Sequence, residues 1–456
     1  MDTSQNAFPH AFAGQMQRLL GDEYAAFEAA HGQPGPVSIR LNKRKYSDAS
    51  LQLDSERIPW CESGRYLAQR PVFTLDPAFH GGAYYVQEPS SMFLEQAFLQ
   101  HVPANGALRI LDLCAAPGGK TTHLLNLMNK DSLLVTNEVI RSRASTLLEN
   151  VQKSGYPNAV VTSNDASDFQ NLPGFFDVIV VDAPCSGEGL FRKDETTMKE
   201  WSERNVELCA ARQQRILEDV WPSLRQGGIL IYSTCTYNKL ENEENLRWLD
   251  AHNNVDYLSI SIKDDWGIVE ISDAPVHGYR FMPHRVKGEG FFMAVIRKND
   301  PHDEIAIRKK QKTFTPAPRN VVAEVIEWLN PDDFQFIQRN DTIQMLPAAW
   351  VDTIHYLSQT LRVLYSGTFL ARQKHTKLVP EHTLALSVYL NRSQFDSIDL
   401  TLEDAIAYLK KDTVNINHSR KGFALAAWNE VALGWMNVVP GRINNLYPPE
   451  WRIRMQ

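Results

Sequence analysis

Five short apolar runs, separated by stretches with helical spacing, constrain the fold of this chain more than any other feature of its sequence. They begin at about residue 107 and read LRILDLC, SLLVTNE, AVVTSND, FDVIVVDA and GGILIYSTC. Each run is apolar almost throughout, whereas a strand with one face in water alternates apolar and polar residues. Apolar strands that alternate with helices form a parallel sheet covered by helices on both faces. The sequence therefore predicts a doubly wound α/β core.

The chain is longer than one such core requires. At about 100 to 200 residues per domain, 456 residues correspond to two to four domains. The N-terminal part opens with an expected amphipathic helix over residues 10–30, in which Phe12, Met16 and Phe27 belong to one apolar stripe. After a last strand-like run, GFFMAVIR, the polar and Pro-containing stretch 298–320 marks a domain boundary.

Beyond that boundary the pattern changes to helical segments (AEVIEWL, TLEDAIAYLK) mixed with strand-like ones (RVLYSGTFLAR, KGFALAAWN, ALGWMNVV). This composition predicts a separate α+β module, or two small ones. We therefore expect a chain truncated near residue 310 to keep the properties of the α/β core.

Composition and charge exclude several classes of protein. Hydrophobic residues at 43% and charged residues at 22% are typical of globular proteins, not of collagen or coiled-coil rods. There is no apolar run of 18 residues, and the start MDTSQNAFPH lacks the features of a signal peptide, so we expect a cytoplasmic protein that does not enter a membrane. A net charge of -7 argues against a protein that coats nucleic acid unselectively.

The five cysteines are odd in number and widely spaced, without a C-x-x-C pair or clustered histidines. This pattern predicts free thiols and no metal site. For Cys61 and Cys209 we expect small buried hydrophobes.

The segment LDLCAAPGGKTTHLL has the form of a strand that ends in a loop of small residues and resumes as a helix. Small residues let the backbone approach a ligand closely, and the helix directs its N-terminus at it. Glu138 ends the next strand, where it can accept from ribose hydroxyls, and Asp165 ends the third, where it can accept from an adenine amino group. The loop matches neither phosphate-binding glycine motif, so S-adenosylmethionine fits better than a nucleotide.

Two cysteines also stand at strand ends. Asp182, Ala183, Pro184 and Cys185 follow the fourth strand, and Cys235 ends the fifth in ILIYSTCTYN. The carboxyl ends of parallel strands share one crevice, so both cysteines should lie beside the ligand.

These residues resemble one family closely, the Nol/Nop/Sun RNA cytosine-5 methyltransferases. The motifs LDLCAAPGGKT, VDAPCSGEG and YSTCTYNKLENEEN are similar to that family's cofactor loop, release-cysteine loop and nucleophile loop. The segments PHAFAGQMQRLLGDEYAAF, VQEPSSM and PHRVKGEGFFMAV match as well, so the resemblance covers essentially the whole chain. The ending GWMNVVPGRINNLYPP resembles the bacterial 16S ribosomal RNA branch, whose members end in a PUA-like RNA-binding module.

The resemblance implies a Rossmann-like class I methyltransferase core between an N-terminal α+β extension and a C-terminal α+β module. The expected division is 1–95 for the N-terminal RNA-binding extension, 96–299 for the catalytic domain, 300–380 for a linker and intermediate domain, and 381–456 for the PUA-like domain. Its partner would be RNA, either 16S rRNA or the small ribosomal subunit, bound by a monomer without a metal. In the C-terminal region we expect basic side chains among aromatics to contact RNA, namely Arg372, Lys374, Lys377, Arg420 and Lys421.

The resemblance also implies the site residues. Those of the S-adenosylmethionine site would be Cys114, Ala115, Ala116, Pro117, Gly118, Gly119, Lys120, Glu138, Asp165 and Asp182. Cys235 would be the nucleophile that adds to carbon 6 of cytosine, which activates carbon 5 for methylation. Asp182 would hold or protonate ring nitrogen 3, Cys185 would remove the proton at carbon 5 so that Cys235 leaves, and Lys120 would help to keep a thiolate available. The target cytosine must be unpaired or flipped out.

Three alternatives remain. A DNA cytosine methyltransferase also has a Pro-Cys loop but uses that cysteine as the nucleophile, and the second cysteine in STCTYN favours RNA. Transfer RNA is an alternative substrate. A non-catalytic RNA-binding assembly factor on the same fold is a third reading, which the presence of Cys185, Cys235 and Asp182 disfavours.

Overall fold

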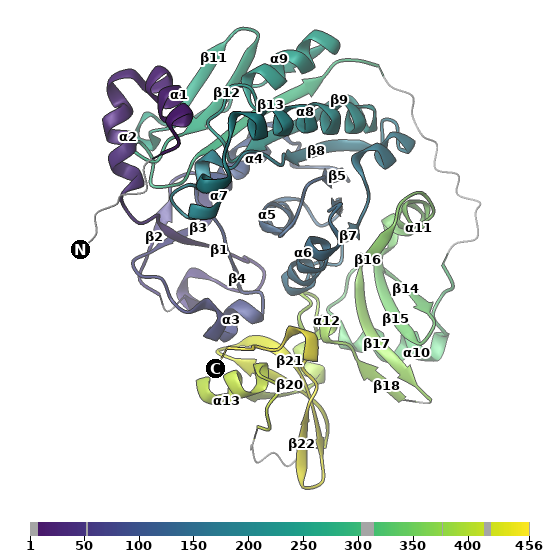
Figure 1. The fold of residues 1–456 in the computed structure, drawn as a ribbon. Helices are drawn as coiled ribbons and strands as arrows, with labels where there is room; N and C mark the ends of the chain where they lie inside the picture. The colour runs from purple at the N-terminus through teal and green to yellow at the C-terminus, as the bar shows by residue number, and fades with distance from the viewer. Residues whose placement is uncertain (1–7, 52, 302–313, 376, 415–420, 456) are drawn as a thin grey trace.

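The computed structural model describes residues 8–51, 53–301, 314–375, 377–414 and 421–455, and it is built around one large mixed sheet (Figure 1). The strand order of that sheet is β11-β12-β13-β9-β8-β5-β6-β7-β16, with β10 also paired to β13. Strands β5 to β9 are parallel to one another, and β13 runs antiparallel to β9. The predicted doubly wound core is therefore confirmed.

The strands of the catalytic part are β5 (Arg109–Asp112), β6 (Leu133–Asn137), β7 (Ala159–Thr162), β8 (Phe176–Asp182), β9 (Leu224–Thr234), β10 (Val255–Tyr257), β11 (Val269–Asp273), β12 (Val276–Phe281) and β13 (Phe291–Lys298). Its helices are α4 (Leu94–His101), α5 (Gly119–Leu127), α6 (Arg141–Ser154), α7 (Glu195–Glu200), α8 (Glu203–Val220) and α9 (Glu243–His252). Two clusters of buried side chains pack against this sheet, one containing Ile110 and Val180 and the other Leu111 and Ile179. Consecutive side chains within β5, and likewise within β8, thus point to opposite faces of the sheet. Both faces are buried, which explains why these strands are apolar throughout.

The N-terminal part combines a helical hairpin with a small antiparallel sheet of order β2-β3-β1-β4. Its elements are α1 (His10–Leu20), α2 (Tyr24–His31), β1 (Val37–Leu41), β2 (Ser55–Ile58), β3 (Cys61–Leu67), α3 (Pro77–His80) and β4 (Tyr84–Val86). The single helix expected over 10–30 is wrong, because a 3-10 turn at Gly21–Glu23 divides it. Phe12, Met16 and Phe27 are nevertheless buried together, so the apolar stripe belongs to a core.

The C-terminal part contains two further four-stranded sheets, of order β14-β15-β17-β18 and β19-β20-β21-β22. Its strands are β14 (Phe334–Arg339), β15 (Thr342–Pro347), β16 (Val363–Ser366), β17 (Thr368–Lys374), β18 (Lys377–Pro380), β19 (Asp396–Asp399), β20 (Gly422–Trp428), β21 (Val431–Val439) and β22 (Arg442–Asn445). Its helices are α10 (Arg319–Val325), α11 (Val351–Thr360), α12 (His382–Ala385) and α13 (Leu402–Leu409). Residues 302–313 of the expected linker lie outside the described residues.

One strand from the C-terminal part belongs to the catalytic sheet. The run RVLYSGTFLAR forms two strands, and the first, β16, pairs antiparallel with β7. Gly367 lies between them with φ +62, a backbone conformation that L side chains rarely adopt. Side chains that follow the linker, including Trp350 and Ile354, pack into one of the cores of the same sheet. The segment after residue 310 is therefore not separate from the catalytic core, contrary to the expectation from composition.

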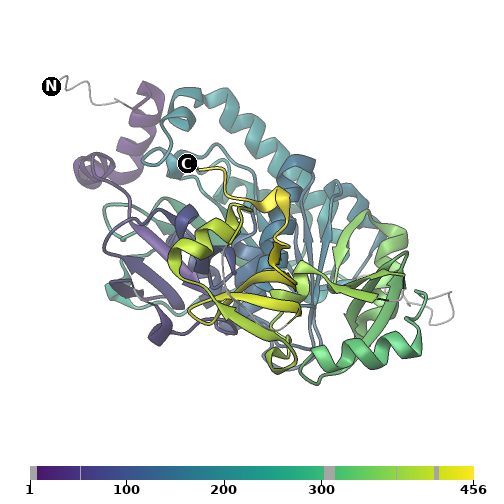
Figure 2. The same ribbon diagram turned by 90° about the horizontal axis from the view of Figure 1, so that it is seen from below.

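The first and last parts of the chain also share a core. Ile39 and Tyr84 of the N-terminal sheet are buried in one cluster with Ile398, Tyr408 and Leu433 of the C-terminal domain. Figure 1 shows α3 against β21 and α13, and the view from below in Figure 2 shows the C-terminal domain lying across the N-terminal and catalytic parts. Among the described helices, none combines the length and apolar character that crossing a bilayer requires.

Candidate active site

Two connected cavities lie at the carboxyl ends of the parallel strands. The larger, of about 540 Å³, is lined by residues that follow β5, β6, β7, β8 and β9, and the second, of about 380 Å³, lies between the cofactor loop and residues of β4 and β13. Residues that line both cavities are Cys114, Ala116, Asp182, Leu190 and Cys235. The crevice expected from the strand-end residues is therefore present, and it has two compartments.

The predicted cofactor loop, Cys114 to Lys120, forms part of these walls. Every residue of the loop except Gly118 lines one cavity or the other. Gly118 has φ +115 and precedes α5, and an added Cβ would lie 3.3 Å from the Cβ of Asn150. Helix α6 holds the loop from outside, because Arg143 Nη2 donates to the Ala116 carbonyl at 2.7 Å and Asn150 Nδ2 donates to the Pro117 carbonyl at 2.8 Å.

Glu138 and Asp165 both line the larger cavity, as expected for strand-end carboxylates. Glu138 is buried, accepts from the Ile140 N–H at 2.9 Å and lies 3.5 Å from Arg143. Asp165 is half-buried and lies 3.2 Å from Arg215. Burial opposes ionisation of Asp165, but hydrogen bonds from Ser167 and Arg215 outweigh it and lower the pKa of this carboxyl. Asp165 thus retains a negative charge in the wall of the cavity where the donors of an adenosine group would lie.

Asp182 lies at the junction of the two cavities and is paired on both oxygens. Lys120 Nζ is 2.7 Å from Oδ2, and Ser233 Oγ donates to Oδ1 at 2.8 Å. The Lys120 ammonium also lies 5.1 Å from the centre of the Phe291 ring. The structure therefore places Lys120 on Asp182, whereas the sequence suggested that it would act on a thiolate.

The two strand-end cysteines are neighbours. Cys185 Sγ and Cys235 Sγ lie 3.1 Å apart, and both side chains are half-buried in the wall of the larger cavity. The hydrogen bond with Cys235, together with burial, raises the pKa of the Cys185 thiol well above its ordinary value. This arrangement keeps the proton on Cys185, so that its S–H can donate to the sulfur of Cys235.

Sequence reasoning missed Asp112, one of three unpredicted carboxyl groups in the wall of the smaller cavity, with Glu88 and Glu289. It ends β5, it is fully buried, and it lines the smaller cavity. Thr121 Oγ1 donates to its Oδ2 at 2.6 Å, but its Oδ1 has no hydrogen-bond partner. Burial raises the pKa of Asp112 to about 7. The signal was present, because this aspartate interrupts an otherwise apolar strand.

The unpartnered Asp112 oxygen bears on the expected cofactor. A buried acceptor without a donor costs free energy, and a cationic ligand in the adjoining cavity would remove that cost. S-adenosylmethionine carries an ammonium and a sulfonium, and the larger cavity has the size of a small-molecule site. The residues present therefore fit this cofactor.

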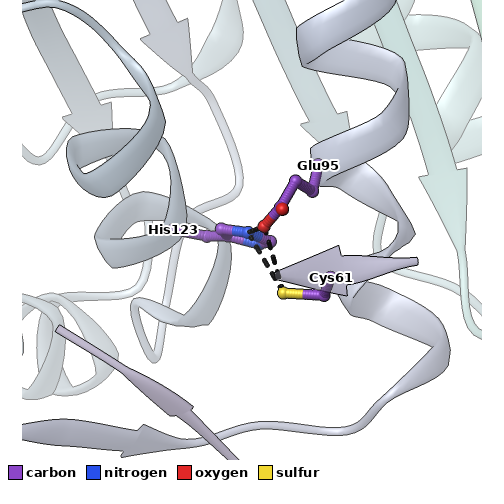
Figure 3. A group of neighbouring side chains, drawn as sticks. All are labelled: Cys61, Glu95 and His123. Atoms are coloured by element: carbon purple, nitrogen blue, oxygen red, sulfur yellow. Dashed lines mark hydrogen bonds and ion pairs between the residues drawn. The ribbon is translucent and has the colours of Figure 1, made fainter. Parts of the chain in front are cut away.

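A second polar cluster lies away from these cavities, at Cys61, Glu95 and His123 (Figure 3). His123 Nε2 is 3.0 Å and Cys61 Sγ 3.1 Å from the same Glu95 oxygen, and the Glu62 N–H donates to the other at 2.8 Å. Burial lowers the pKa of His123 to about 4 and raises the pKa of Cys61 to about 12. Burial also opposes ionisation of Glu95, but its interactions with His123 outweigh this effect and lower the pKa of Glu95 to about 2. A neutral imidazole and a neutral thiol that donate to one carboxylate satisfy this geometry.

A metal at His123 Nε2 would require a proton on Nδ1, which is buried and has no acceptor. The absence of a metal site stays a prediction. The cluster is a hydrogen-bonded network that joins β3, α4 and α5.

The structure describes four of the five C-terminal basic residues that were expected to contact RNA. Arg372 of β17 lies 3.1 Å from Glu381, so its charge is already paired. Lys374, Lys377 and Lys421 are exposed, and Arg420 lies outside the described residues.

Three protein-family models match the chain in order. "N-terminal domain of 16S rRNA methyltransferase RsmF" matches residues 8–89, "16S rRNA methyltransferase RsmB/F" matches 99–297, and "Methyltransferase RsmF PUA domain" matches 395–453. The match over 99–297 spans both cavities except for the wall formed by β4 and the residues after it.

Curated relatives carry the same description. A ribosomal RNA small subunit methyltransferase F of Pectobacterium atrosepticum is 35% identical over 75% of each chain, and one of Vibrio cholerae is 30% identical over 97% of each chain. Among solved structures, a methyltransferase homologue from Pyrococcus horikoshii is 28% identical, with a TM-score of 0.55 over 64% of this chain and 96% of that one. A second structure, NSun6 of the same organism, shares the fold at 22% identity and a TM-score of 0.55 over 64% of this chain and 99% of that one.

Proposed function

The chain belongs to the 16S rRNA methyltransferase RsmB/F family, with the N-terminal and PUA domains of its RsmF members, and on that premise we propose that it methylates carbon 5 of a cytosine in 16S rRNA. It is an RNA methyltransferase with a Rossmann-like core. S-adenosylmethionine is the proposed methyl donor and supplies an electrophilic methyl group when bound. Because the proposed substrate is ribosomal RNA, we expect the enzyme to act in the cytoplasm.

The observation that carries the proposal is the pair of sulfurs 3.1 Å apart where the two cavities meet. Carbon 5 of cytosine is a weak nucleophile, and covalent addition at carbon 6 makes it a stronger one. A mechanism that adds and later expels a thiol needs one sulfur to attack and one base to remove a proton. Cys235 and Cys185 can fill these two roles without a change of backbone position.

In the proposed first step the Cys235 thiolate forms a bond to carbon 6. The electrons of the 5,6 double bond move into the ring, and ring nitrogen 3 takes a proton from water in the cavity, which it gives back to water when the ring is restored. Asp182 accepts a hydrogen bond from the protonated nitrogen. Its ion pair with Lys120 holds the Asp182 side chain in place. Carbon 5 then forms a bond to the methyl group while the bond between that methyl group and the donor sulfur breaks, so that S-adenosylhomocysteine is the leaving group.

In the second step Cys185 acts as the base. Once Cys235 is bonded to carbon 6, the largest cause of the raised pKa of Cys185 is gone, and its proton can pass to water in the cavity. The Cys185 thiolate then takes the proton from carbon 5, the electrons of that C–H bond restore the 5,6 double bond, and the carbon–sulfur pair returns to Cys235. The product is 5-methylcytosine, and both cysteines are regenerated.

The target base must leave its helix to reach these sulfurs. The smaller cavity, lined by Tyr85, Phe291 and Glu289, adjoins Cys235 and offers aromatic faces for a base. We assign the larger cavity to the adenosine of the cofactor, since it contains Glu138 and Asp165. The smaller cavity is assigned to the cationic end of the cofactor beside Asp112 and to the flipped cytosine.

Bisulfite sequencing of ribosomal and transfer RNA from a deletion strain tests the proposal. We expect one or more 16S rRNA cytosines to lose protection, and purified enzyme with cofactor to restore it on 16S rRNA or small subunits. Loss of protection confined to transfer RNA would assign the other substrate. Unchanged protection in all RNA, together with inactive purified enzyme, would overturn cytosine-5 methylation.

A further inference from the structure

Glu241 and Asn242 are adjacent in the sequence and buried. Glu241 contacts the loop that carries Cys185, and Asn242 contacts the loop that carries Cys235. They follow β9 and immediately precede α9, and neither has any exposed surface. A carboxyl group is almost never fully buried unless its oxygens are well partnered. The partners of the Glu241 carboxylate are Ser186, which follows Cys185, and Gln213.

Glu241 holds the Cys185 loop from both sides. The Ser186 N–H donates to Glu241 Oε2 at 2.8 Å, and the Ser186 hydroxyl donates to Oε1. Gln213 Nε2 lies 3.0 Å from the same Oε2 and 3.0 Å from the carbonyl of Pro184. Ser186 follows Cys185 and Pro184 precedes it, so one carboxylate and its glutamine partner fix the backbone on each side of that cysteine.

Asn242 holds the Cys235 loop in the same way. Its Oδ1 accepts from Thr234 Oγ1 at 2.6 Å, and its Nδ2 donates to the carbonyl of Thr236 at 3.0 Å. These are the residues on either side of Cys235. An asparagine before a helix usually caps it with its side chain, but Asn242 makes no such bond to α9. Its amide is used for the cysteine loop instead.

We propose that Glu241 and Asn242 are separate positioning residues for the two halves of the reaction, Glu241 placing Cys185 for release and Asn242 placing Cys235 for attack. The inference rests on the proposed function. Because each side chain contacts the neighbours of only one cysteine, its loss should affect one step more than the other. A purely structural brace would affect both steps together.

The test measures the covalent protein–RNA adduct and its decay separately. In Cys185→Ala, the adduct should form and persist, so its rate of appearance on a denaturing gel reports the attack of Cys235 alone. Glu241→Ala and Asn242→Ala are each combined with that variant, using a 16S rRNA transcript and S-adenosylmethionine. Calorimetry of cofactor binding accompanies each variant, and Glu244→Gln, an exposed position in the same segment, is the matched control.

We expect Asn242→Ala to slow adduct formation in the Cys185→Ala background by about tenfold or more, the effect of one or two lost buried hydrogen bonds. Glu241→Ala should leave that rate unchanged. With Cys185 present, Glu241→Ala should instead accumulate adduct, with turnover reduced by about tenfold or more. Cofactor affinity should not change in either variant, and Glu244→Gln should match the unaltered protein in every measurement.

Glu241→Gln should restore release, because its amide oxygen can still accept from the Ser186 N–H and its amide nitrogen can donate to the Ser186 hydroxyl. Asn242→Asp should not restore attack, because a carboxylate cannot donate to the Thr236 carbonyl. Where thermal unfolding shows that Glu241→Ala does not fold, Glu241→Asp draws the carboxylate away from Ser186 while keeping its charge, and should also accumulate adduct.

The division of roles would be overturned if both alanine variants slowed adduct formation equally. It would also be overturned if neither variant changed the formation or the decay of the adduct. These results require that Cys185→Ala forms adduct. If it forms none, the covalent mechanism itself is wrong, and the inference fails with it.

Discussion

The sulfur atoms of Cys185 and Cys235 lie 3.1 Å apart, although fifty positions separate them in the chain. They meet because β8 and β9 are parallel neighbours, with Asp182 opposite Ser233, so that the loops after the two strands leave the sheet side by side. The two cysteines have different surroundings, and this difference leads to the first prediction.

Substitution of the two cysteines should block the reaction at different steps. Cys235→Ala should abolish methylation and form no covalent RNA adduct, because no thiolate reaches carbon 6. Cys185→Ala should methylate once and then remain joined to RNA. A denaturing gel with labelled RNA separates these outcomes, and Cys209→Ala, a buried cysteine outside the cavities, is the control. Adduct with Cys235→Ala but not with Cys185→Ala would exchange the roles.

Asp165→Ala should weaken S-adenosylmethionine binding while the fold is retained. The lost interaction is a charge-assisted hydrogen bond, and at this half-buried position we expect about 1 kcal/mol, or roughly fivefold in Kd. Calorimetry measures it. Asp219→Ala removes another carboxylate near the same Arg215 without altering the cavity wall and should leave the affinity unchanged. Equal effects of the two substitutions would exclude a direct contact by Asp165.

Asp112→Asn should change how stability depends on pH in the absence of cofactor. The pKa of Asp112 rises on folding from 3.8 to about 7, so its contribution is complete below pH 4 and is lost as pH rises through 7. Between pH 5 and 8 the variant should therefore gain about 2 to 3 kcal/mol relative to the unaltered protein. Urea unfolding at several pH values measures the difference. Parallel pH profiles would show that Asp112 does not titrate in this range.

Truncation after residue 313 should destabilise the catalytic domain, because it removes β16 from the edge of β7 and uncovers the core that contains Ile354. A chain that ends at residue 380 retains both and should bind cofactor more tightly than the shorter one. Calorimetry and thermal unfolding of the two chains provide the comparison. A stable 1–313 chain with full cofactor affinity would show that β16 is dispensable.

The sequence predicted the five parallel strands and β13, because each of these is identified by its own local pattern, whereas β10, β11 and β12 were not predicted. Strand β16 was not predictable in the same way, since its partner β7 lies about 200 residues earlier and nothing in RVLYSGTFLAR identifies that edge. The sequence correctly placed the Cys114–Lys120 loop, Glu138 and Asp182 in the walls of the cavities, because strand ends in a parallel sheet share one edge, and their binding roles stay predictions. Glu241 and Asn242 were missed because burial and hydrogen-bond partners, not residue type, distinguish them, whereas Asp112 was missed although it interrupts an apolar strand.

The core shared by Ile39 and Ile398 has a consequence for synthesis on the ribosome. About 360 residues separate these side chains, which at 5–20 residues per second is roughly 20–70 s of translation. During that time the N-terminal sheet of a nascent chain presents one apolar face without its partner. The N-terminal sheet therefore cannot complete its core until the C-terminal domain has been synthesised.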